Sequence, residues 1–500
     1  SAIVASEQNR FTKLWQNEDP NVRVFDIPES IKQRIVKLRS SERPYNFAFN
    51  EFDYQEKLKP HPTLPTDFKP REYQNEAVKA WFDNSNKGFF DMATGTGKTK
   101  TSLLAAVQLF ERQGRIALII TCPYKHLVEQ WDNEVVSFGF LPIRAYESFA
   151  SWSDDLGNRI MAFNNKDTDS LCVITTNTTF LTDRFANLIK QINGPMMLIA
   201  DEAHHFGTEK SKQYFPHQIP NRLALSATPN RWFDEEGTNT LNEYFGETIY
   251  SFPLARAIEE GYLTPYEYHP IPVELTDAEM DSYADLTAKI VPILSKQHKT
   301  ENDEKRLLSL LLRRADILKN AEKKLDELRK ILKQLGKIDH AIFYCAPAQR
   351  VSVLQILGLE NRIRTHQFTY REDSRIRRNL LNQFDRGILQ AIVAIKCLDE
   401  GVDVPSSRTA FFLANSSNPR EFVQRRGRVL RKADGKTKAA LYDFLTIPPD
   451  PEDKLDYELT RKILKKELTR FDEFAKSSLT FHGAYEVIWE IARKFNVLDF

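Results

Sequence analysis

One short segment has the residues of a phosphate-binding loop. Residues 92–99 read Met-Ala-Thr-Gly-Thr-Gly-Lys-Thr, and Met92 stands where the usual G-x-x-x-x-G-K-[ST] pattern has its first glycine. The two glycines let the backbone curl so that its N–H groups point at phosphate oxygens. The lysine would reach the β- and γ-phosphates, and the last threonine hydroxyl would bind Mg²⁺. The expected ATP contacts are Gly95, Thr96, Gly97, Lys98 and Thr99.

A second segment, about a hundred residues downstream, carries adjacent carboxylates. Residues 201–204 read Asp-Glu-Ala-His and follow the apolar run 196–200, which predicts a buried strand. Asp201 at the strand tip would hold Mg²⁺ together with Thr99, and Glu202 would orient and activate the attacking water. Either segment alone is a weak signal. Both in this order, each after an apolar strand, predict an enzyme that hydrolyses a nucleoside triphosphate with Mg²⁺.

A third segment is basic. Residues 424–431 read Gln-Arg-Arg-Gly-Arg-Val-Leu-Arg. Taken alone, such a run is more often a solvated helix face. Following the other two segments, it predicts arginines that reach across a cleft and stabilise charge on the transferring phosphoryl group.

The length and net charge of the chain indicate its domain count and limit how it could bind nucleic acid. The chain has 500 residues, 41% of them hydrophobic and 28% charged, with a net charge of +1. These values are typical of a folded water-soluble protein of about three domains. Because the net charge is close to zero, any surface that binds nucleic acid must be local.

The cysteines and the apolar segments bear on compartment. Cys122, Cys172, Cys345 and Cys397 lie in or beside strand-like runs without paired C-x-x-C spacing. Buried reduced thiols are therefore favoured over metal ligands or disulfides. The sequence has no long uncharged apolar stretch and no secretory signal, so we expect a cytoplasmic protein without a membrane span.

Hydrophobic patterning predicts an α/β fold. Between residues 67 and 255 apolar strands alternate with helical stretches, as at 116–121, 171–176, 196–200 and 223–226, and a second series runs from 341 to 444. This alternation is typical of parallel sheets with crossover helices. Leucines at 311, 318, 325 and 332 predict one long amphipathic helix over 303–335, ended by Gly336 and packed on its own protein rather than in an intermolecular coiled coil. Prolines at 448, 449 and 451 mark a linker, and two charged helices follow over 453–496.

Over residues 67–445 the chain resembles superfamily 2 helicases and translocases. Residues 70–74 resemble the upstream nucleotide motif, 226–228 match motif III, 343–346 resemble motif IV, 400–405 match the end of motif V, and 424–431 match motif VI. Residues 122–131 and 175–177 look like motifs Ia and Ib, which touch the nucleic-acid backbone in this family. The resemblance implies two tandem RecA-like parallel-sheet domains with a helical insertion and a helical C-terminal tail.

The resemblance also implies roles for individual residues. The nucleotide would contact Arg71, Gln74, Gly401 and Asp403, and the catalytic set would comprise Lys98, Asp201, Glu202, Gln424, Arg428 and Arg431. Hydrolysis would be coupled to strand movement through His204, Ser226 and Thr228. Nucleic acid would contact Pro123, Tyr124, His126, Thr175, Thr176, Ala346 and Cys397. Motif V often has threonine where Cys397 stands, so a hydroxyl contact to phosphate would be missing there or replaced by a backbone N–H.

We expect five parts along the chain. They are an N-terminal accessory segment at 1–66, a first RecA-like domain at 67–255, a helical linker or insertion at 256–335, a second RecA-like domain at 336–445 and a helical tail at 446–500.

The residues that occupy the motif positions favour a DNA motor. Residues 92–99 look like the loop of type I restriction motor subunits, and 399–431 resemble XPB-type repair translocases and the helicase subunits of restriction and phage-defence systems. We therefore expect a DNA-stimulated ATPase in restriction or antiviral defence, or in repair. The alternatives are an RNA helicase, and a sensor that clamps nucleic acid and signals to a partner without unwinding.

A nuclease would have to come from outside these residues. The sequence has no H-x-K-x₄-D pattern and no convincing Asp…Glu-x-Lys set. Residues 8–40 resemble the region that follows a phospholipase D-like nuclease domain in some defence helicases. Since the chain begins at Ser1 rather than Met, we expect a fragment or processed form, with cutting supplied by a missing domain or another subunit.

Overall fold

The computed structural model describes residues 61–206, 209–226, 235–296, 300–369, 374–395, 404–414, 419–448 and 454–497, with residues 12, 16 and 372 as isolated positions. Contacts divide the chain into the units Ser1–Lys59 and Pro60–Phe500, and both sheets belong to the second unit. The accessory segment predicted at 1–66 therefore lies almost wholly outside the described residues.

The first sheet has seven parallel strands in the order β3-β4-β2-β5-β6-β1-β7. Every residue of β2, β4 and β5 is buried, so these central strands are covered on both faces, as is typical of parallel sheets. The strands are β1 Lys87–Met92, β2 Ile116–Cys122, β3 Pro142–Ala145, β4 Ser170–Thr176, β5 Met196–Ala200, β6 Asn221–Ser226 and β7 Thr248–Phe252.

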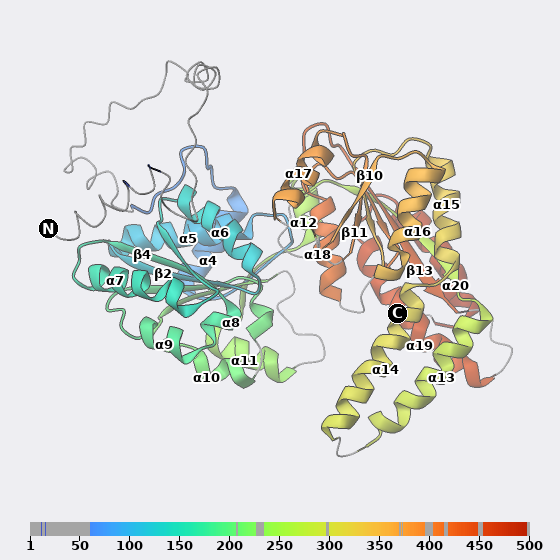
Figure 1. The fold of residues 1–500 in the computed structure, drawn as a ribbon, viewed down its shortest axis with the longest axis horizontal. Coiled ribbons are helices and arrows are strands. Elements are labelled where there is room, and N and C mark those ends of the chain that lie inside the picture. Colours follow the sequence, from blue (N-terminus) through green and yellow to red (C-terminus); the bar gives the residue numbers. More distant parts are fainter. Residues whose placement is uncertain are drawn as a thin grey trace. The chain divides into compact units, whose positions relative to one another are not determined.

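Helices cover both faces of this sheet (Figure 1). One hydrophobic cluster joins it to α4 Glu72–Asp83, α5 Lys98–Gln113 and α6 Lys125–Ser137. A second cluster joins the opposite face to α7 Ser153–Asn164, α9 Asp183–Ile189 and α11 Glu235–Phe245. Shorter helices are α8 Asn177–Phe180, α10 Glu209–Tyr214 and α12 Leu254–Glu259.

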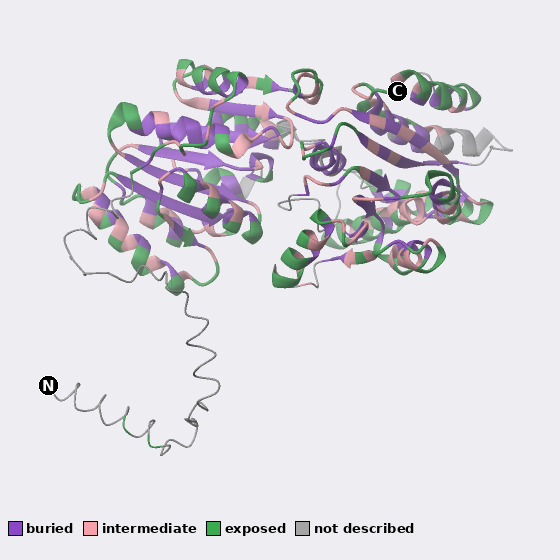
Figure 2. Ribbon diagram, turned by 90° about the horizontal axis from the view of Figure 1, so that it is seen from above, coloured by how far each residue is buried: buried purple, intermediate pink, exposed green. Residues whose placement is uncertain are grey.

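The second sheet has six parallel strands in the order β10-β11-β9-β12-β13-β8. Its strands are β8 Tyr266–Glu274, β9 Ala341–Tyr344, β10 Thr365–Phe368, β11 Ala391–Ala394, β12 Thr409–Phe412 and β13 Ala439–Ile447. Around it lie α15 Lys323–Leu335, α16 Arg350–Gln355, the π-helical turn Ile356–Glu360, α17 Ser374–Asp385 and α18 Pro419–Val429. The strands of both sheets form the buried interior (Figure 2).

Strand β8 was not expected, because residues 256–335 were predicted to be a helical linker. The strand alternates buried and partly buried side chains and pairs with β13 along its whole length. His269, Pro270 and Pro272 interrupt the apolar pattern by which a strand is recognised in the sequence. Proline is tolerated here because β8 is the edge strand of its sheet.

The single long helix predicted over 303–335 is wrong. The chain forms α14 Glu301–Lys319 and α15, with a break at Asn320. The leucine repeat continues across the break, but its two halves pack on different partners. Leu311 lies with α13 Asp277–Leu294, whereas Leu328 lies in the core of the second sheet. Lys324 caps the break from inside, since its Nζ donates to Leu318 O at 2.7 Å and to Leu413 O at 2.8 Å. Burial lowers the pKa of this lysine to about 8.

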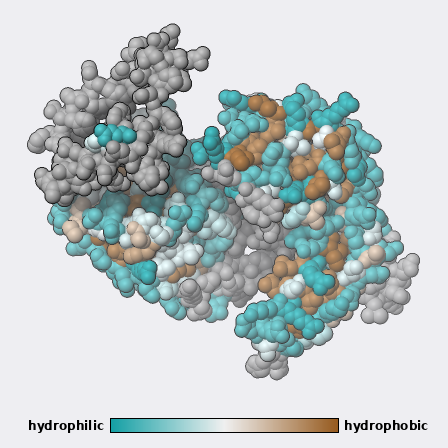
Figure 3. Space-filling view, viewed as in Figure 1, coloured by the Kyte–Doolittle hydropathy of each residue, from teal (hydrophilic) through white to brown (hydrophobic). Residues whose placement is uncertain are grey.

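The predicted packing of this region on its own protein is confirmed, and Gly336 ends α15 with a φ of 66°. The paired helices α13 and α14 leave Leu308 and Leu312 exposed on α14, where Figure 3 shows apolar side chains at the surface.

The two charged helices predicted near the C-terminus are confirmed as α19 Lys454–Ala475 and α20 Phe481–Lys494. A buried ionic cluster fixes α19 to the second sheet. Arg470 Nε donates to Asp443 Oδ2 on β13 at 3.1 Å, and its NH2 group donates to Glu467 Oε2 at 2.9 Å. Tyr268 on β8 donates its hydroxyl to the same Asp443 oxygen. The tail is thus an integral part of the second domain.

Candidate ATP-hydrolysis site

The expected motifs of the first domain follow five neighbouring strands. In the order β4-β2-β5-β6-β1, these strands precede motif Ib, motif Ia, the Asp201 segment, motif III and the phosphate-binding loop. Because parallel strands have their carboxyl ends at one edge of the sheet, all five segments meet there. The two carboxylates directly follow β5. On one side of β5 lie β6 and β1, which lead to motif III and the phosphate loop, and on the other side lie β2 and β4, which lead to motifs Ia and Ib.

The phosphate loop, residues 93–97, joins β1 to α5. Gly95 and Gly97 have φ angles of 90° and 87°, which glycine adopts without the strain of a side chain. Thr96 Oγ1 donates to Ala93 O at 2.7 Å and closes the turn. Lys98 Nζ lies back across the loop and donates to Met92 O at 3.1 Å. With the amino-terminal N–H groups of α5, this arrangement suits an anion bound over the loop.

The upstream segment braces this loop. Tyr73 is fully buried, stacks on Phe252 with ring centroids 4.0 Å apart, and donates its hydroxyl to Thr96 O. Gln74 Nε2 donates to Thr101 Oγ1 at 3.1 Å, and its Oε1 accepts from the Arg71 backbone N–H. Both ends of the Gln74 amide are therefore engaged with protein. In this structure Gln74 supports α4 and α5, and its adenine contact stays a prediction.

Asp201 is held from two directions. Its Oδ2 accepts from the Trp131 indole N–H at 2.8 Å, and its Oδ1 accepts from the Glu202 backbone N–H at 3.0 Å. Its own backbone N–H donates to Thr121 O on β2 at 2.8 Å. The carboxylate is nearly buried, so these donors fix its orientation at the strand end.

Glu202 has a φ of 45°, in the left-handed region that side chains other than glycine rarely adopt. Such strain costs free energy and is commonly retained at functional sites. Glu202 Oε2 lies 3.5 Å from His204 Nδ1, and the same ring nitrogen lies 3.4 Å from Ser226 Oγ at the end of β6. The structure therefore brings Glu202, His204 and Ser226 together, while Thr228 lies outside the described residues.

The donor set fits Mg²⁺ bound with ATP. The described residues contain no group of three His, Cys, Asp or Glu side chains that could hold a metal alone. Asp201 supplies a carboxylate and Thr99, in the first turn of α5, a hydroxyl. Mg²⁺ accepts such oxygens together with phosphate oxygens and water, so a nucleotide would complete the site.

Helix α18 of the second domain packs directly on the phosphate loop. A Cβ placed on Gly427 would lie 2.5 Å from Thr94 Cβ and 3.0 Å from Thr94 O. A Cβ on Gly95 would lie 3.0 Å from Arg431 Cγ and 3.2 Å from Gly427 O. No side chain fits at Gly427, and the stem of Arg431 lies against Gly95. The structure therefore brings Arg431 to the loop that Lys98 spans.

Two arginines of α18 make hydrogen bonds within the second domain. Arg425 NH1 donates to Ala414 O at 3.0 Å, and Arg426 NH2 donates to Glu473 Oε1 on α19 at 2.7 Å. These two anchor the helix to its own domain. Arg428 is buried on the same helix, one residue after Gly427, and Gln424 is buried one turn earlier. The predicted roles of Arg428 and Gln424 toward ATP stay predictions, and Gly401 and Asp403 lie outside the described residues.

The segments expected to touch nucleic acid differ in exposure. Tyr124 and His126 are exposed at the start of α6, with rings stacked 5.6 Å apart, and Pro123 beside them is partly exposed. Thr175 is fully buried and donates its hydroxyl to Ala145 O at 2.6 Å. Thr176 caps α8 and is also buried. Neither hydroxyl is available to a polymer in this structure.

Two further expected polymer contacts belong to the second domain. Ala346 is buried after β9, and its backbone N–H donates to Gln349 Oε1 at 3.2 Å. Its predicted contact is therefore not accessible in this structure. Cys397 lies outside the described residues.

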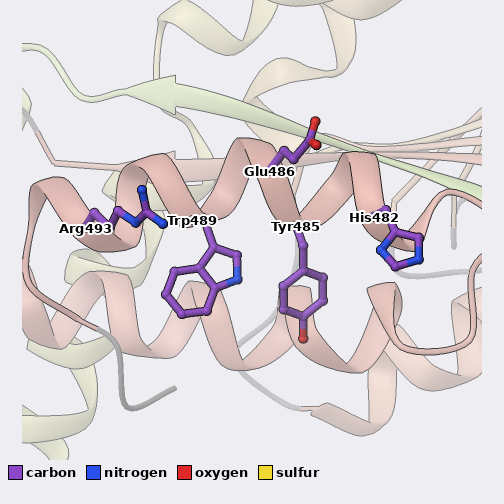
Figure 4. A pocket seen from close by; sticks show the side chains of 5 residues that line it. All are labelled: His482, Tyr485, Glu486, Trp489 and Arg493. Atoms are coloured by element: carbon purple, nitrogen blue, oxygen red, sulfur yellow. The ribbon is translucent and has the colours of Figure 1, made fainter.

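Other features do not add to this site. Cys122, Cys172 and Cys345 are free and buried, and burial raises the pKa of each thiol, to about 12 for Cys345. No helix among the described residues is long and apolar enough to cross a membrane. A shallow hollow of about 340 Å³ runs along α20, where the side chains in Figure 4 project from the helix. It is lined by His482, Tyr485, Glu486, Trp489 and Arg493.

Sequence reasoning missed three residues of the site: Tyr73, Trp131 and Gly427. Each acts through a partner far along the chain, at a separation of 23 residues for Tyr73 and Thr96 and 70 for Trp131 and Asp201. Their signals were present in part, since all three stand inside motif segments. A buried indole or phenol usually has a hydrogen-bond acceptor, but the sequence does not say which.

Comparisons with known proteins agree with this geometry. Residues 67–231 match the family model "Type III restriction enzyme, res subunit", and residues 323–433 match "Helicase conserved C-terminal domain". The chain is 28% identical over 430 residues to the DNA 3'-5' translocase XPB2 of Sulfurisphaera tokodaii, covering 81% of this chain and 86% of that protein.

Two further relatives are longer than the part they share. The chain is 26% identical over 369 residues to the putative DNA 3'-5' helicase Rad25 of Haloarcula marismortui, covering 73% of this chain and 50% of that protein. The solved structure of the type ISP restriction-modification enzyme LlaBIII bound to DNA aligns with a TM-score of 0.57 and 17% identity. That alignment covers 86% of this chain and 32% of LlaBIII, and it supports the fold alone.

The position of Glu202 predicts a separation of binding from turnover. Glu202→Gln should lower steady-state ATPase turnover by about 10²–10⁴-fold, because the amide cannot take a proton from the attacking water. Nucleotide affinity should stay near that of the unmodified protein, since Asp201 and Thr99 remain. Exposed Glu243 provides the matched control Glu243→Gln, which should change neither quantity. Near-normal turnover of Glu202→Gln would refute the assignment.

The contact of Arg431 with the phosphate loop predicts a loss concentrated in chemistry. Arg431→Ala should lower turnover by about 10³-fold or more while changing ATP affinity by less than about tenfold. The reason is that a guanidinium near the γ-phosphate stabilises charge that develops only in the transition state. Lys432→Ala, next to it and exposed, is the control. Equal losses in affinity and turnover for Arg431→Ala would mean that this arginine only holds the fold.

Proposed function

We propose that this chain, which carries the two-domain ATP-hydrolysing core of a superfamily 2 helicase, is a motor that moves along DNA. The observation that carries the proposal is the packing of Gly427 on Thr94, with Arg431 against Gly95. Groups from both domains thereby share one phosphate loop. ATP bound there would be held by Lys98 from one side and by Arg431, with Arg428, from the other.

Movement follows from this shared site. Shared phosphate contacts favour the closed arrangement of the two domains while ATP is bound. Mg²⁺ would polarise the phosphates and lower the barrier to water attack. Glu202 would take the proton of that water, and loss of the γ-phosphate would remove the contact expected of Arg431. The domains then separate, and a strand gripped alternately by each would be advanced by one step.

Two observations support DNA as the track. The relative XPB2 is a DNA translocase by name, and it aligns over 86% of its length. Tyr124 and His126 form an exposed aromatic pair beside the central strands, and such rings suit contact with an unpaired strand. The expected contacts are to backbone and base faces, so stepping should depend little on sequence.

We further propose a role in restriction or antiviral defence. The support is the match of residues 67–231 to the family model of a type III restriction enzyme subunit. Cutting would then require a nuclease domain or subunit outside the residues given. A cytoplasmic location accords with the free thiols of Cys122, Cys172 and Cys345. The alternatives are an RNA helicase and a nucleic-acid clamp that signals without unwinding.

A polymer titration tests the proposal. Single-stranded DNA should raise ATPase turnover severalfold or more, with RNA of matched length less effective and base sequence nearly irrelevant. The measurement is steady-state ATPase against polymer concentration at two salt concentrations, because phosphate contacts weaken as salt rises. A labelled-duplex displacement assay in the same buffer separates a motor from a clamp.

Each other outcome of the titration has a defined meaning. Stimulation by RNA alone would replace the DNA motor by an RNA helicase. Stimulation by DNA without strand displacement or translocation would favour the clamp. No stimulation by any polymer would refute the proposal.

A further inference from the structure

We propose that Trp131 is a positioning residue that orients the Asp201 carboxylate for Mg²⁺ and links it to the segment of α6 that faces nucleic acid. Only the second part of this inference, the link to the nucleic-acid-facing segment, rests on the proposed function. The first half concerns metal and can be tested without any polymer.

The geometry of the indole carries the first step. Trp131 is about 1% exposed, and its Nε1 donates to Asp201 Oδ2 at 2.8 Å. The N–H is the only polar group of the side chain, and it can only donate. Outer hydrogen-bond partners of a metal-binding carboxylate set its orientation and its charge distribution. Trp131 has this relation to Asp201.

The helix that carries Trp131 supplies the second step. Helix α6 begins at Lys125, directly after Tyr124, and runs for 13 residues. The exposed pair Tyr124 and His126 therefore stands less than two turns before Trp131 on one rigid element. Any rotation or shift of α6 that a bound strand imposes moves the indole relative to β5.

The far side of α6 is fixed, which limits how it can move. Asp132, next to Trp131, receives two hydrogen bonds from Arg144 on β3, at 2.9 Å from Nε and 2.6 Å from NH2. Leu127 and Val128 are buried against the sheet. With both its first turn and its middle packed on the sheet, α6 would move as a unit, so a shift imposed on it at Tyr124 and His126 would reach Trp131.

A second contact reaches the same carboxylate residue from motif Ib. Thr121 Oγ1 donates to Asn177 Oδ1 at 2.8 Å, and Thr121 O accepts the Asp201 backbone N–H at 2.8 Å. Asn177 opens α8, immediately after Thr176. Both segments expected to contact the polymer are therefore linked to Asp201. Motif Ia reaches its carboxylate through Trp131, and motif Ib reaches its backbone N–H through Asn177 and Thr121.

The test compares two buried tryptophans of the same domain. Trp131→Phe removes the N–H and keeps an aromatic ring. Trp81→Phe is the matched control, because Trp81 is also fully buried and its Nε1 donates at 3.0 Å to Arg222 O, away from the site. Binding of Mn²⁺, used as a probe for Mg²⁺, is measured by electron paramagnetic resonance in the presence of ADP. The ratio of ATPase rates with and without single-stranded DNA is the second measurement.

We expect Trp131→Phe to weaken Mn²⁺ binding about 10–100-fold, the usual effect of losing such a partner. We also expect it to lower the stimulation by DNA, with a fall in kcat larger than any rise in KM for ATP. Trp81→Phe should change neither. If Trp131→Phe misfolds, benzothienylalanine at position 131 replaces the N–H by sulfur in a ring of the same shape and gives the same comparison.

The outcomes separate the two proposals. Unchanged Mn²⁺ affinity in the variant would overturn the positioning role, whatever the polymer does. Weakened Mn²⁺ binding with unchanged stimulation would overturn the link to α6 and keep the role toward metal. If DNA fails to stimulate the unmodified protein, the proposed function and the link both fall, and the metal measurement still decides the positioning role.

Discussion

The rest of the site depends on the close approach of the backbone at Gly427 to Thr94. A side chain at position 427 would overlap Thr94, so helix α18 can lie on the phosphate loop only because this residue is glycine. That approach sets Arg431 against Gly95 and brings the second domain to the phosphate loop. We expect neither domain alone to be catalytically competent, because the first supplies the loop, Lys98 and the carboxylates and the second supplies Arg431. In the proposed motor, alternation between closed and open states follows from dividing one site between two domains.

The first domain adds a second constraint, namely the order of its strands. Strand β5 lies beside β2, so Asp201 has the phosphate loop to one side and the motif Ia and Ib segments to the other. Asp201 and the motif Ia segment, a predicted polymer contact, are therefore one strand spacing apart. Trp131 spans that spacing through its indole, and Thr121 spans it through the backbone. Glu202, with its strained backbone, directly follows Asp201 at the end of β5.

Local patterns allowed much of the fold and of the ATP site to be predicted. The apolar run before Asp201 indicated the end of a strand, and the glycines of the loop indicated a tightly curled backbone; β5 and the positive φ angles of Gly95 and Gly97 agree with both. Contacts between distant segments were not accessible in the same way. The leucine repeat over 303–335 could not reveal that Leu311 and Leu328 pack on different cores, and β8 was obscured by Pro270 and Pro272. Thr175 matched a motif by type, but its hydroxyl is buried against Ala145 O, a fact that depends on the pairing of β3 and β4.

Hydrogen exchange measured by mass spectrometry tests the shared site most directly. The comparison is between the free protein and the protein with Mg²⁺ and a non-hydrolysable ATP analogue, for peptides that cover residues 93–99 and 424–431. The account predicts that backbone amides in both segments become protected, since the nucleotide binds to the loop of one domain and the arginines of the other. Protection of residues 93–99 alone, with exchange over 424–431 unchanged, would contradict it.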